Sequence, residues 1–118
     1  MLDEKTIFIN DTDRQHIRAV DVAADGRLAN GRVWARTVGE DPGAPDGMQI
    51  DSAGNLYCCG PGGTHVFAAA ATAHGVIKVP EYTANFCWGD GGLKSLFIAA
   101  STSLYRIRVN TSGTPQMR

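Results

Sequence analysis

A short pattern, one small polar residue followed by aliphatic, aromatic and apolar residues, occurs three times along the chain. It covers residues 6–9, 55–58 and 95–98, at offsets of 49 and 40 residues. Each copy is typical of a short buried strand. A second run with strand character follows each copy, at residues 17–22, 64–67 and 104–109. Self-similarity at such a period is the signature of repeat architectures, so the chain must stack similar units.

Further strands complete the repeating unit. Residues 47–51 and 85–89 precede the second and third copies, and residues 28–36 and 75–79 end the first and second. The turns at 51–54 and 89–92 are rich in Asp and Gly, as hairpins that need positive φ require. The unit is a four-stranded antiparallel meander of about 40 to 50 residues, the size of one β-propeller blade. We predict an all-β chain with three, four and three strands in successive blades.

A small β-sandwich is the alternative architecture, because it also has short, regularly spaced strands. A sandwich does not account for the offset near 40 residues. The one serious helix candidate is the alanine-rich segment 67–74. It is short and lacks an N-cap and an amphipathic period, so we interpret it as a connection between the third and fourth strands of the middle blade.

Composition excludes several functions. The chain has 118 residues, which is the usual size of one domain. It contains 11 Lys and Arg residues and 12 Asp and Glu residues, so its net charge is −1. No basic run is present, so we expect no binding to nucleic acids or to acidic membranes. No apolar stretch could span a bilayer and no export signal is recognisable, which favours the cytoplasm. The three cysteines, Cys58, Cys59 and Cys87, are an odd number and are expected to be reduced thiols.

Longer phrases of the chain occur in the order seen in one known family. They are PDGM at 45–48, IDSAGNLY at 50–57, GPGG at 60–63 and HVF at 65–67, with FINDT at 8–12, HIRAVDV at 16–22, NGRV at 30–33, ANFCWG at 84–89 and STSLYRI at 101–107. In these phrases the chain resembles the C-terminal part of the gluconolactonase, senescence marker protein (regucalcin) and luciferin-regenerating enzyme family. The resemblance runs across nearly the whole sequence.

Members of that family are six-bladed propellers that hold a divalent metal at the axial channel and hydrolyse sugar lactones or related esters. Six blades of about 40 to 50 residues need roughly 240 to 300 residues. The resemblance therefore implies a partial six-bladed propeller of about two and a half blades. Residues 1–110 would carry the end of blade 4, blade 5 and most of blade 6, and residues 111–118, which have tail composition, are expected to fray.

The resemblance also implies a metal site. In the family, the ligands are a Glu near the start of blade 1, an Asn in a Pro-Asn-Gly phrase opening blade 4 and an Asp in a Pro-Asp-Gly phrase opening blade 5. Only the last is in this sequence, as Asp46, the implied metal ligand and candidate general base. The metal would polarise the lactone carbonyl as a Lewis acid. Calcium is favoured, while zinc, magnesium and manganese stay open because one carboxylate suits them all.

Each candidate site residue also has a simpler interpretation. The phrase Pro-Asp-Gly around Asp46 is a strong turn signature by itself. Asn85 occupies in the third copy nearly the place of Asp46 in the second, and would line the channel or cap a strand. Asp11, with Asn10, follows a strand and could approach the channel, although Asn-Asp-Thr-Asp is itself typical of a turn.

Other chemistry-bearing residues carry weaker signals. The glycines at 60–63 are not followed by Lys-Ser or Lys-Thr and precede a strand, so they predict a hairpin turn and not a phosphate loop. Trp34 and Trp88 fall on strands and are expected in contacts between blades. The histidines lack metal-ligand spacing and are expected at the surface or in satisfied core positions; they are His16, His65 and His74.

Two functions from different classes remain. The first is a metal-dependent sugar-lactone hydrolase, present here as its C-terminal portion, with a sugar lactone as the small-molecule partner. The alternative is a non-catalytic propeller piece that acts as a binding or assembly module, because two of the implied metal ligands are missing. Either way, open blade faces are expected to drive self-association. Counted as strands, two copies would make five blades with the wrong strand order at each junction, which argues against a closed dimer.

Overall fold

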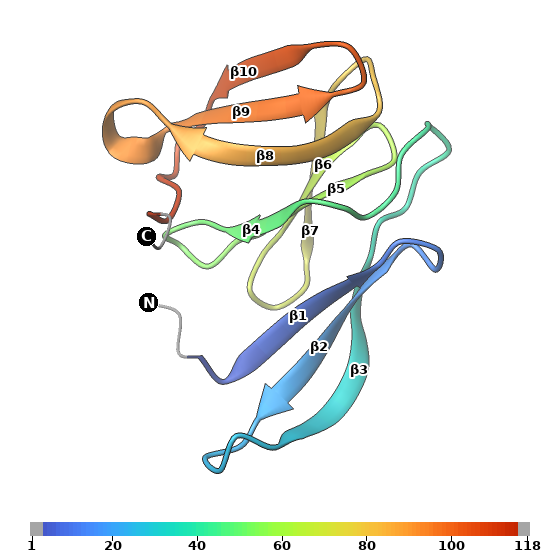
Figure 1. Cartoon of the computed structure of the whole chain (residues 1–118), viewed down its shortest axis with the longest axis vertical. Helices are drawn as coiled ribbons and strands as arrows, with labels where there is room; N and C mark the ends of the chain where they lie inside the picture. The colour runs from blue at the N-terminus through green and yellow to red at the C-terminus, as the bar shows by residue number, and fades with distance from the viewer. Residues whose placement is uncertain (1–3, 116–118) are drawn as a thin grey trace.

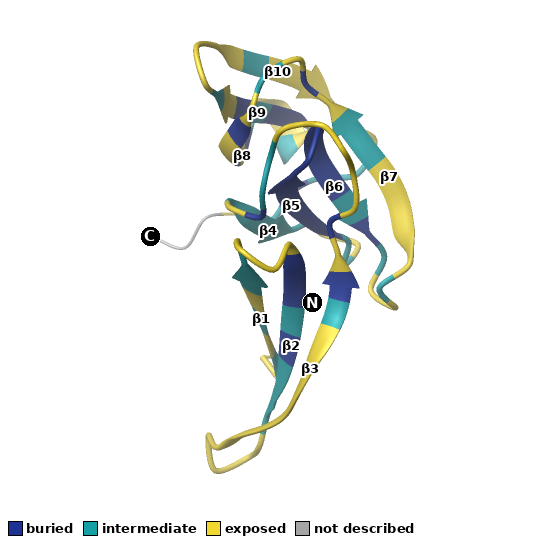
Figure 2. Ribbon diagram, turned by 90° about the vertical axis from the view of Figure 1, so that its right-hand side faces the viewer, coloured by how far each residue is buried: buried dark blue, intermediate teal, exposed yellow. Residues whose placement is uncertain are grey.

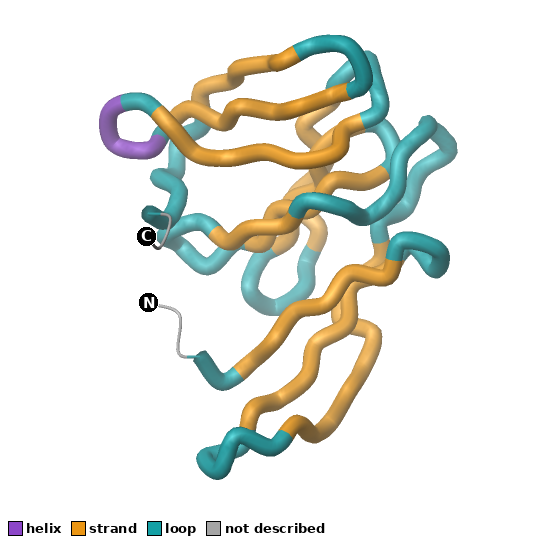
Figure 3. The backbone as a smooth tube through the Cα atoms, viewed as in Figure 1, coloured by secondary structure: helices purple, strands orange, loops and turns teal. Residues whose placement is uncertain are grey.

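The computed structural model describes residues 4–115 as three antiparallel β-sheets, shown in Figures 1 and 3. Their order in space is β1-β2-β3, β4-β5-β6-β7 and β10-β9-β8, and η1 (Gly91–Leu93) is a single turn of 3-10 helix. The strands are β1 (Thr6–Asp11), β2 (His16–Val22), β3 (Leu28–Arg36), β4 (Met48–Ile50), β5 (Leu56–Gly60), β6 (Gly63–Phe67), β7 (Ala73–Lys78), β8 (Thr83–Gly89), β9 (Ser95–Ala100) and β10 (Leu104–Arg108). The predicted all-β fold, with three, four and three strands, is confirmed.

The three sheets follow one another as consecutive propeller blades, with the four-stranded sheet in the middle (Figure 1). Keeping the positions that the family resemblance implies, we name them blade 4 (β1–β3), blade 5 (β4–β7) and blade 6 (β8–β10). Residues 68–72 form a turn between β6 and β7, in which the Ala71 N–H donates to the Ala68 carbonyl at 2.9 Å, so the predicted connection is confirmed. Within residues 4–115, no helix is long and apolar enough to cross a membrane.

Blade 5 packs on both of its neighbours because successive side chains of a strand point to opposite faces of the sheet. On β5, Leu56 and Cys58 belong to the apolar cluster shared with blade 4, and Tyr57 and Cys59 to the cluster shared with blade 6. All residues of β5 are buried, and Figure 2 shows the contrast with the largely exposed outer strand β7. The continuous apolar run of β5 thus contributes side chains to both apolar clusters between the blades.

Aromatic rings join the blades at both junctions. The Trp34 ring lies between Phe8 of its own blade and Phe67 of blade 5, with ring centroids 4.9 and 5.9 Å apart. The Trp88 ring meets the Tyr57 ring edge-on at 4.9 Å across the other junction. Both tryptophans therefore lie in blade-to-blade contacts, as the sequence predicts.

The segment after β10 differs from the sequence expectation. Its backbone is bonded to the rest of the fold: the Ser52 N–H donates to the Ser112 carbonyl at 2.9 Å, and the Gly113 N–H to the Leu93 carbonyl at 2.8 Å. The Thr114 hydroxyl donates to the Ile50 carbonyl at 2.8 Å. The frayed tail expected over 111–118 is therefore wrong for 112–114, because composition does not reveal these partners; residues 116–118 lie outside the described range.

A pH dependence follows from the buried phenol of Tyr57, which donates to Asp51 Oδ2 at 3.1 Å. Burial and then the Asp51 carboxylate raise the pKa of Tyr57 to about 12. Because this value exceeds the unfolded value near 10, the stabilisation is complete below pH ~10 and is lost as pH rises through ~12. We expect Tyr57→Phe to flatten the fall in melting temperature over that interval. Thermal melts at stepped pH test this, with Tyr82→Phe, at an exposed tyrosine, as the control; identical profiles for Tyr57→Phe and wild type would contradict it.

Candidate functional site

The loop Pro45-Asp46-Gly47, which enters β4, is held by all three blades. From blade 4, the Thr12 hydroxyl donates to the Pro45 carbonyl at 2.8 Å. The Gly47 carbonyl accepts from the Cys59 N–H of blade 5, and the Gly47 N–H donates to the Ala84 carbonyl just inside β8, both at 2.9 Å. These bonds fix the position of Asp46 at the point where the blades meet.

Glycine is required at position 47 by the close approach of blade 6. A Cβ there would lie 2.7 Å from the Asn85 Cα and still closer to the Asn85 amide oxygen. The backbone of the loop can approach β8 only without a side chain at this position. Because Gly47 has no side chain, Asn85 can lie directly against the loop, one residue after Asp46.

Polar residues of the two neighbouring blades, Asn10 and Asn85, lie beside this loop and its own Asp46. Asn10 of β1 donates its amide N–H to the Asp46 carbonyl. Asp46 is exposed, and Asn85 of β8 is exposed with its Oδ1 accepting from the Phe86 N–H at 2.9 Å. Asp46 and Asn85, both predicted from the sequence, thus lie together where the first strands of two blades begin.

Asp11 lies in the same hairpin as Asn10, but the contacts described for its side chain are with residues of that hairpin and not with the Asp46 loop. Its carboxylate accepts from the Arg14 N–H at 3.0 Å and from the Arg14 guanidinium at 2.9 Å. These two hydrogen bonds hold the pKa of Asp11 below its ordinary value. Because neighbouring strand residues point to opposite faces, Asn10 and not Asp11 contacts the Asp46 loop.

The histidines differ in their surroundings. His74 is exposed, and the ring of buried His65 lies 2.8 Å from the Pro61 carbonyl, with burial lowering the pKa of His65. His16 is buried, its Nε2 lies 3.7 Å from Asp11 Oδ2, and neither ring nitrogen has a hydrogen-bond partner among the described residues. The expected satisfied core position is therefore wrong for His16, and no spacing signal in the sequence distinguishes it.

The adjacent cysteines lie beneath the site and are not suited to nucleophilic chemistry. Burial raises the pKa of Cys58 to about 12, with the Cys59 thiol and the Asp46 carboxylate acting in the same direction. Burial likewise raises the pKa of Cys59. Since the thiolate is the nucleophile, both remain inert thiols at neutral pH. All three cysteines are free, as predicted, and Cys87 is exposed.

The donor set fits part of a metal shell. Within residues 4–115, no three His, Cys, Asp or Glu side chains gather in a way that could hold a metal ion. The Asp46 loop offers one exposed carboxylate and neighbouring amide groups, which are oxygen donors of the kind that calcium and magnesium prefer. These residues suit a hard cation, but a complete shell needs further donors.

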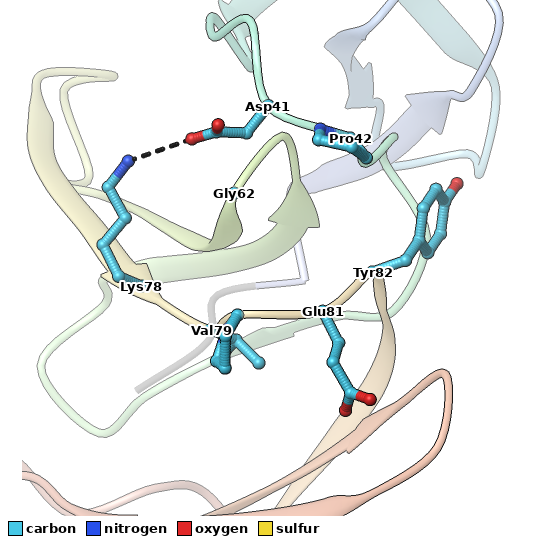
Figure 4. Close-up of a pocket in the computed structure, with 8 residues that line it drawn as sticks. Asp41, Pro42, Gly62, Lys78, Val79, Glu81 and Tyr82 are labelled. Atoms are coloured by element: carbon cyan, nitrogen blue, oxygen red, sulfur yellow. Dashed lines mark hydrogen bonds and ion pairs between the residues drawn. The ribbon is translucent and has the colours of Figure 1, made fainter.

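A cavity of about 390 Å³ lies at the same end of blade 5, beside its outer strand (Figure 4). Pro42, Gly62, Val79 and Tyr82 line it, and a 3.3 Å ion pair between Asp41 and Lys78 crosses one side. The Glu81 carboxylate points away, since it accepts hydrogen bonds from Thr102 and Tyr105. The sequence gives no signal for this cavity, which forms from a loop without regular structure and two turns.

Comparison with known proteins identifies relatives of this architecture. A sequence profile of the SMP-30/gluconolactonase/LRE-like region matches residues 2–102. A gluconolactonase from Zymomonas mobilis subsp. mobilis is 32% identical over 121 aligned positions, which cover 94% of this chain and 33% of that protein. Among solved structures, a gluconolactonase from Xanthomonas campestris superposes with a TM-score of 0.76 at 29% identity, over 90% of this chain and 34% of the other.

A luciferin-regenerating enzyme superposes with a TM-score of 0.83 at 20% identity, over 96% of this chain and 44% of the other. The chain thus spans between a third and less than half of the length of these proteins. The superpositions confirm the partial six-bladed propeller, and the profile covers most of the sequence. The chain belongs to the SMP-30/gluconolactonase/LRE-like family.

Proposed function

We propose that this chain carries part of the active site of a metal-dependent sugar-lactone hydrolase. The observation that carries the proposal is the convergence of all three blades on the Asp46 loop, which presents an exposed carboxylate at the meeting point of the blades. Family membership and the gluconolactonase from Zymomonas mobilis supply the substrate class.

Each polar residue of the loop region has a role in this proposal. Asp46 contributes a carboxylate ligand, and as a base it accepts a proton from the water that attacks the lactone carbonyl carbon. The Asn10 amide positions the Asp46 backbone, and the Asn85 amide lines the channel beside it. Asp11, oriented by Arg14, stays a channel-side candidate. A bound divalent ion, calcium by preference and otherwise zinc, magnesium or manganese, would polarise the carbonyl, and attack by water opens the ring to the hydroxy acid.

Hydrolysis of δ-gluconolactone by the purified chain, with and without a chelator, tests the proposal. We expect chelator-sensitive turnover, with the missing ligands supplied by further copies of the self-associating chain, and a loss of about 10² to 10³ in rate for Asp46→Ala, the usual loss for an electrostatic stabiliser. Asp41→Ala is the matched control, because Asp41 is a carboxylate at the same end but belongs to the outer cavity. Equal rates for Asp46→Ala and the control, or turnover that ignores the chelator, would contradict it.

A second candidate, a non-catalytic binding or assembly module, is favoured by a specific observation. Asp46 supplies the only carboxylate that the described contacts bring to the loop, whereas a hydrolytic metal site needs several protein ligands. Absence of turnover together with calcium binding too weak for calorimetry would support this candidate. The two functions therefore separate in one set of measurements.

A further inference from the structure

The cavity of about 390 Å³ beside β7 is formed by connections around the middle blade. Its walls are the loop that leads into β4, the turn between β5 and β6, and the connection between β7 and β8. Among the described residues, none of β1–β3 or β8–β10 lines it, and neither does Asp46. The cavity is therefore separate both from the outer faces of blades 4 and 6 and from the Asp46 loop.

Backbone hydrogen bonds join the three walls to one another. The Gly62 N–H donates to the Pro42 carbonyl at 3.2 Å, and the Val79 N–H donates to the Gly62 carbonyl at 3.1 Å. Gly62 has a φ of +81°, and a Cβ there would lie 3.0 Å from Asp41 Oδ2 and 3.5 Å from Lys78 Nζ. Glycine at position 62 thus lets the turn adopt a left-handed conformation directly beside the ion pair of Asp41 and Lys78.

Blade 6 fixes the Tyr82 side of the cavity. The Ser101 N–H donates to the Tyr82 carbonyl at 3.0 Å. The Glu81 carboxylate accepts from the hydroxyls of Thr102 and Tyr105, which tie it to blade 6 and turn it away from the cavity (Figure 4). The walls are thus held in place without a ligand, and a preformed site loses little conformational entropy on binding.

The lining combines apolar surface with one ion pair. Pro42, Val79 and Tyr82 supply the apolar surface, and the 40% exposure of Tyr82 leaves its ring accessible. The side chains of Lys78 and Asp41 are 74% and 64% exposed, and an ion pair this exposed adds little to the stability of the fold. An ammonium group has three N–H donors and Asp41 accepts one of them, so the Lys78 ammonium keeps two for a ligand.

Charge and shape together select a neutral ligand with a ring. Asp41 balances the charge of the Lys78 ammonium, so an anion gains no net attraction here, whereas a hydroxyl oxygen can still accept from the ammonium N–H groups. A pyranose ring carries hydroxyls around its rim and C–H groups on its faces, which can pack on the ring of Tyr82. A volume of about 390 Å³ lies at the small end of the roughly 300 to 1,000 Å³ of small-molecule sites, which suits one ring.

We propose that this cavity is a second carbohydrate-binding site, which holds one neutral sugar ring away from the Asp46 loop. One face of the sugar packs on Tyr82 and Pro42, and the Lys78 ammonium donates to the hydroxyls at the rim of the ring. Asp41 holds the ammonium in position. The proposal does not rest on the proposed hydrolysis, because the cavity shares no lining residue with the Asp46 loop.

Titration of the wild-type chain with methyl β-glucopyranoside, followed by two-dimensional amide NMR, tests the proposal. This probe is a neutral ring and contains no lactone. We expect saturable shifts for the amides of Gly62, Val79 and Tyr82, and none for those of Asp46 and Asn85. Cyclohexanol, a ring with a single hydroxyl, should bind about tenfold more weakly, because it lacks most of the hydrogen bonds. Methyl β-glucuronide, the anionic form of the same ring, should bind no more tightly than the glucoside.

Three results of this titration would overturn the proposal. They are the absence of saturable shifts around the cavity, shifts centred on the Asp46 loop, and binding of cyclohexanol or of the glucuronide that equals or exceeds the expected limit. The titration requires neither a metal ion nor turnover. A failure of this proposal is therefore distinguishable from a failure of the proposed hydrolysis.

Substitutions assign the contacts. Lys78→Met keeps the stem and removes the ammonium, and Tyr82→Ala removes the ring, so each should weaken glucoside binding about tenfold. Tyr82→Phe keeps the ring and should bind within about twofold of wild type. Lys94→Met is the matched control, since Lys94 is exposed and follows β8 at the end away from Tyr82. Unchanged binding in Lys78→Met or Tyr82→Ala, with the fold verified by circular dichroism, would contradict the assignment; if either variant does not fold, the wild-type shifts decide.

Discussion

Trp88→Ala is expected to lower the free energy of unfolding by about 4 kcal/mol, in the range of large-to-small substitutions of buried aromatic residues. Trp88 is 6% exposed and lies edge-on to Tyr57 of the neighbouring blade. The Trp88 indole also packs directly against the C-terminal segment, since a Cβ at Gly113 would lie 1.9 Å from the indole Cγ. Removing the ring therefore opens a cavity shared by blade 5, blade 6 and residues 112–114.

Denaturant titration at one fixed protein concentration measures this effect, because association would otherwise shift the apparent stability. Trp88→Phe is the informative control. It keeps most of the apolar contact and removes the indole Nε1–H, which is buried without a partner among the described residues. We expect it to cost much less than Trp88→Ala. A loss below about 1 kcal/mol for Trp88→Ala would show that the blade junction does not depend on this ring.

The fold was predictable from the sequence because the signal is periodic. The copies at 6–9, 55–58 and 95–98 became β1, β5 and β9, each beginning within one residue of its copy. The position of a side chain in the packing was predictable only for residue types that favour one environment. Trp34 and Trp88, which were expected in contacts between blades, are the examples. The C-terminal segment was not, because its order depends on backbone carbonyls of Ile50 and Leu93 that no composition rule reveals.

The candidate site was predictable to a smaller extent. Asp46 and Asn85 lie together because they precede or begin equivalent strands, which the repeat makes visible. The choice between Asn10 and Asp11 depends on which face of β1 each one occupies, and one residue of register reverses it. The unpartnered nitrogens of His16 and the cavity beside Lys78 arise from tertiary contacts alone. The loop itself was therefore predictable from the sequence, but its surroundings were not.

Asp51→Ala is expected to lower the free energy of unfolding by about 3 kcal/mol, because it leaves one buried and three part-buried donors without an acceptor. Asp51 is 2% exposed. Its Oδ1 accepts from the N–H groups of Ala53 and Asn55 at 2.9 and 3.0 Å, and its Oδ2 from the Asn55 amide at 2.9 Å and the Tyr57 hydroxyl at 3.1 Å. One carboxylate thus organises the β4–β5 turn and anchors a core tyrosine.

Asp51→Asn separates geometry from charge at this position. Its amide oxygen can keep both backbone bonds of the turn, while its N–H groups face the Asn55 amide, so we expect an intermediate loss of stability. Denaturant titration ranks the variants, and absorbance titration of the tyrosines gives a second readout. The Asp51 carboxylate adds to the effect of burial in raising the pKa of Tyr57, so both substitutions should move that pKa back toward its ordinary value. Equal stability of Asp51→Ala and wild type would mean that water replaces the carboxylate in the turn, and would leave the β4–β5 hairpin held by its strand pairing alone.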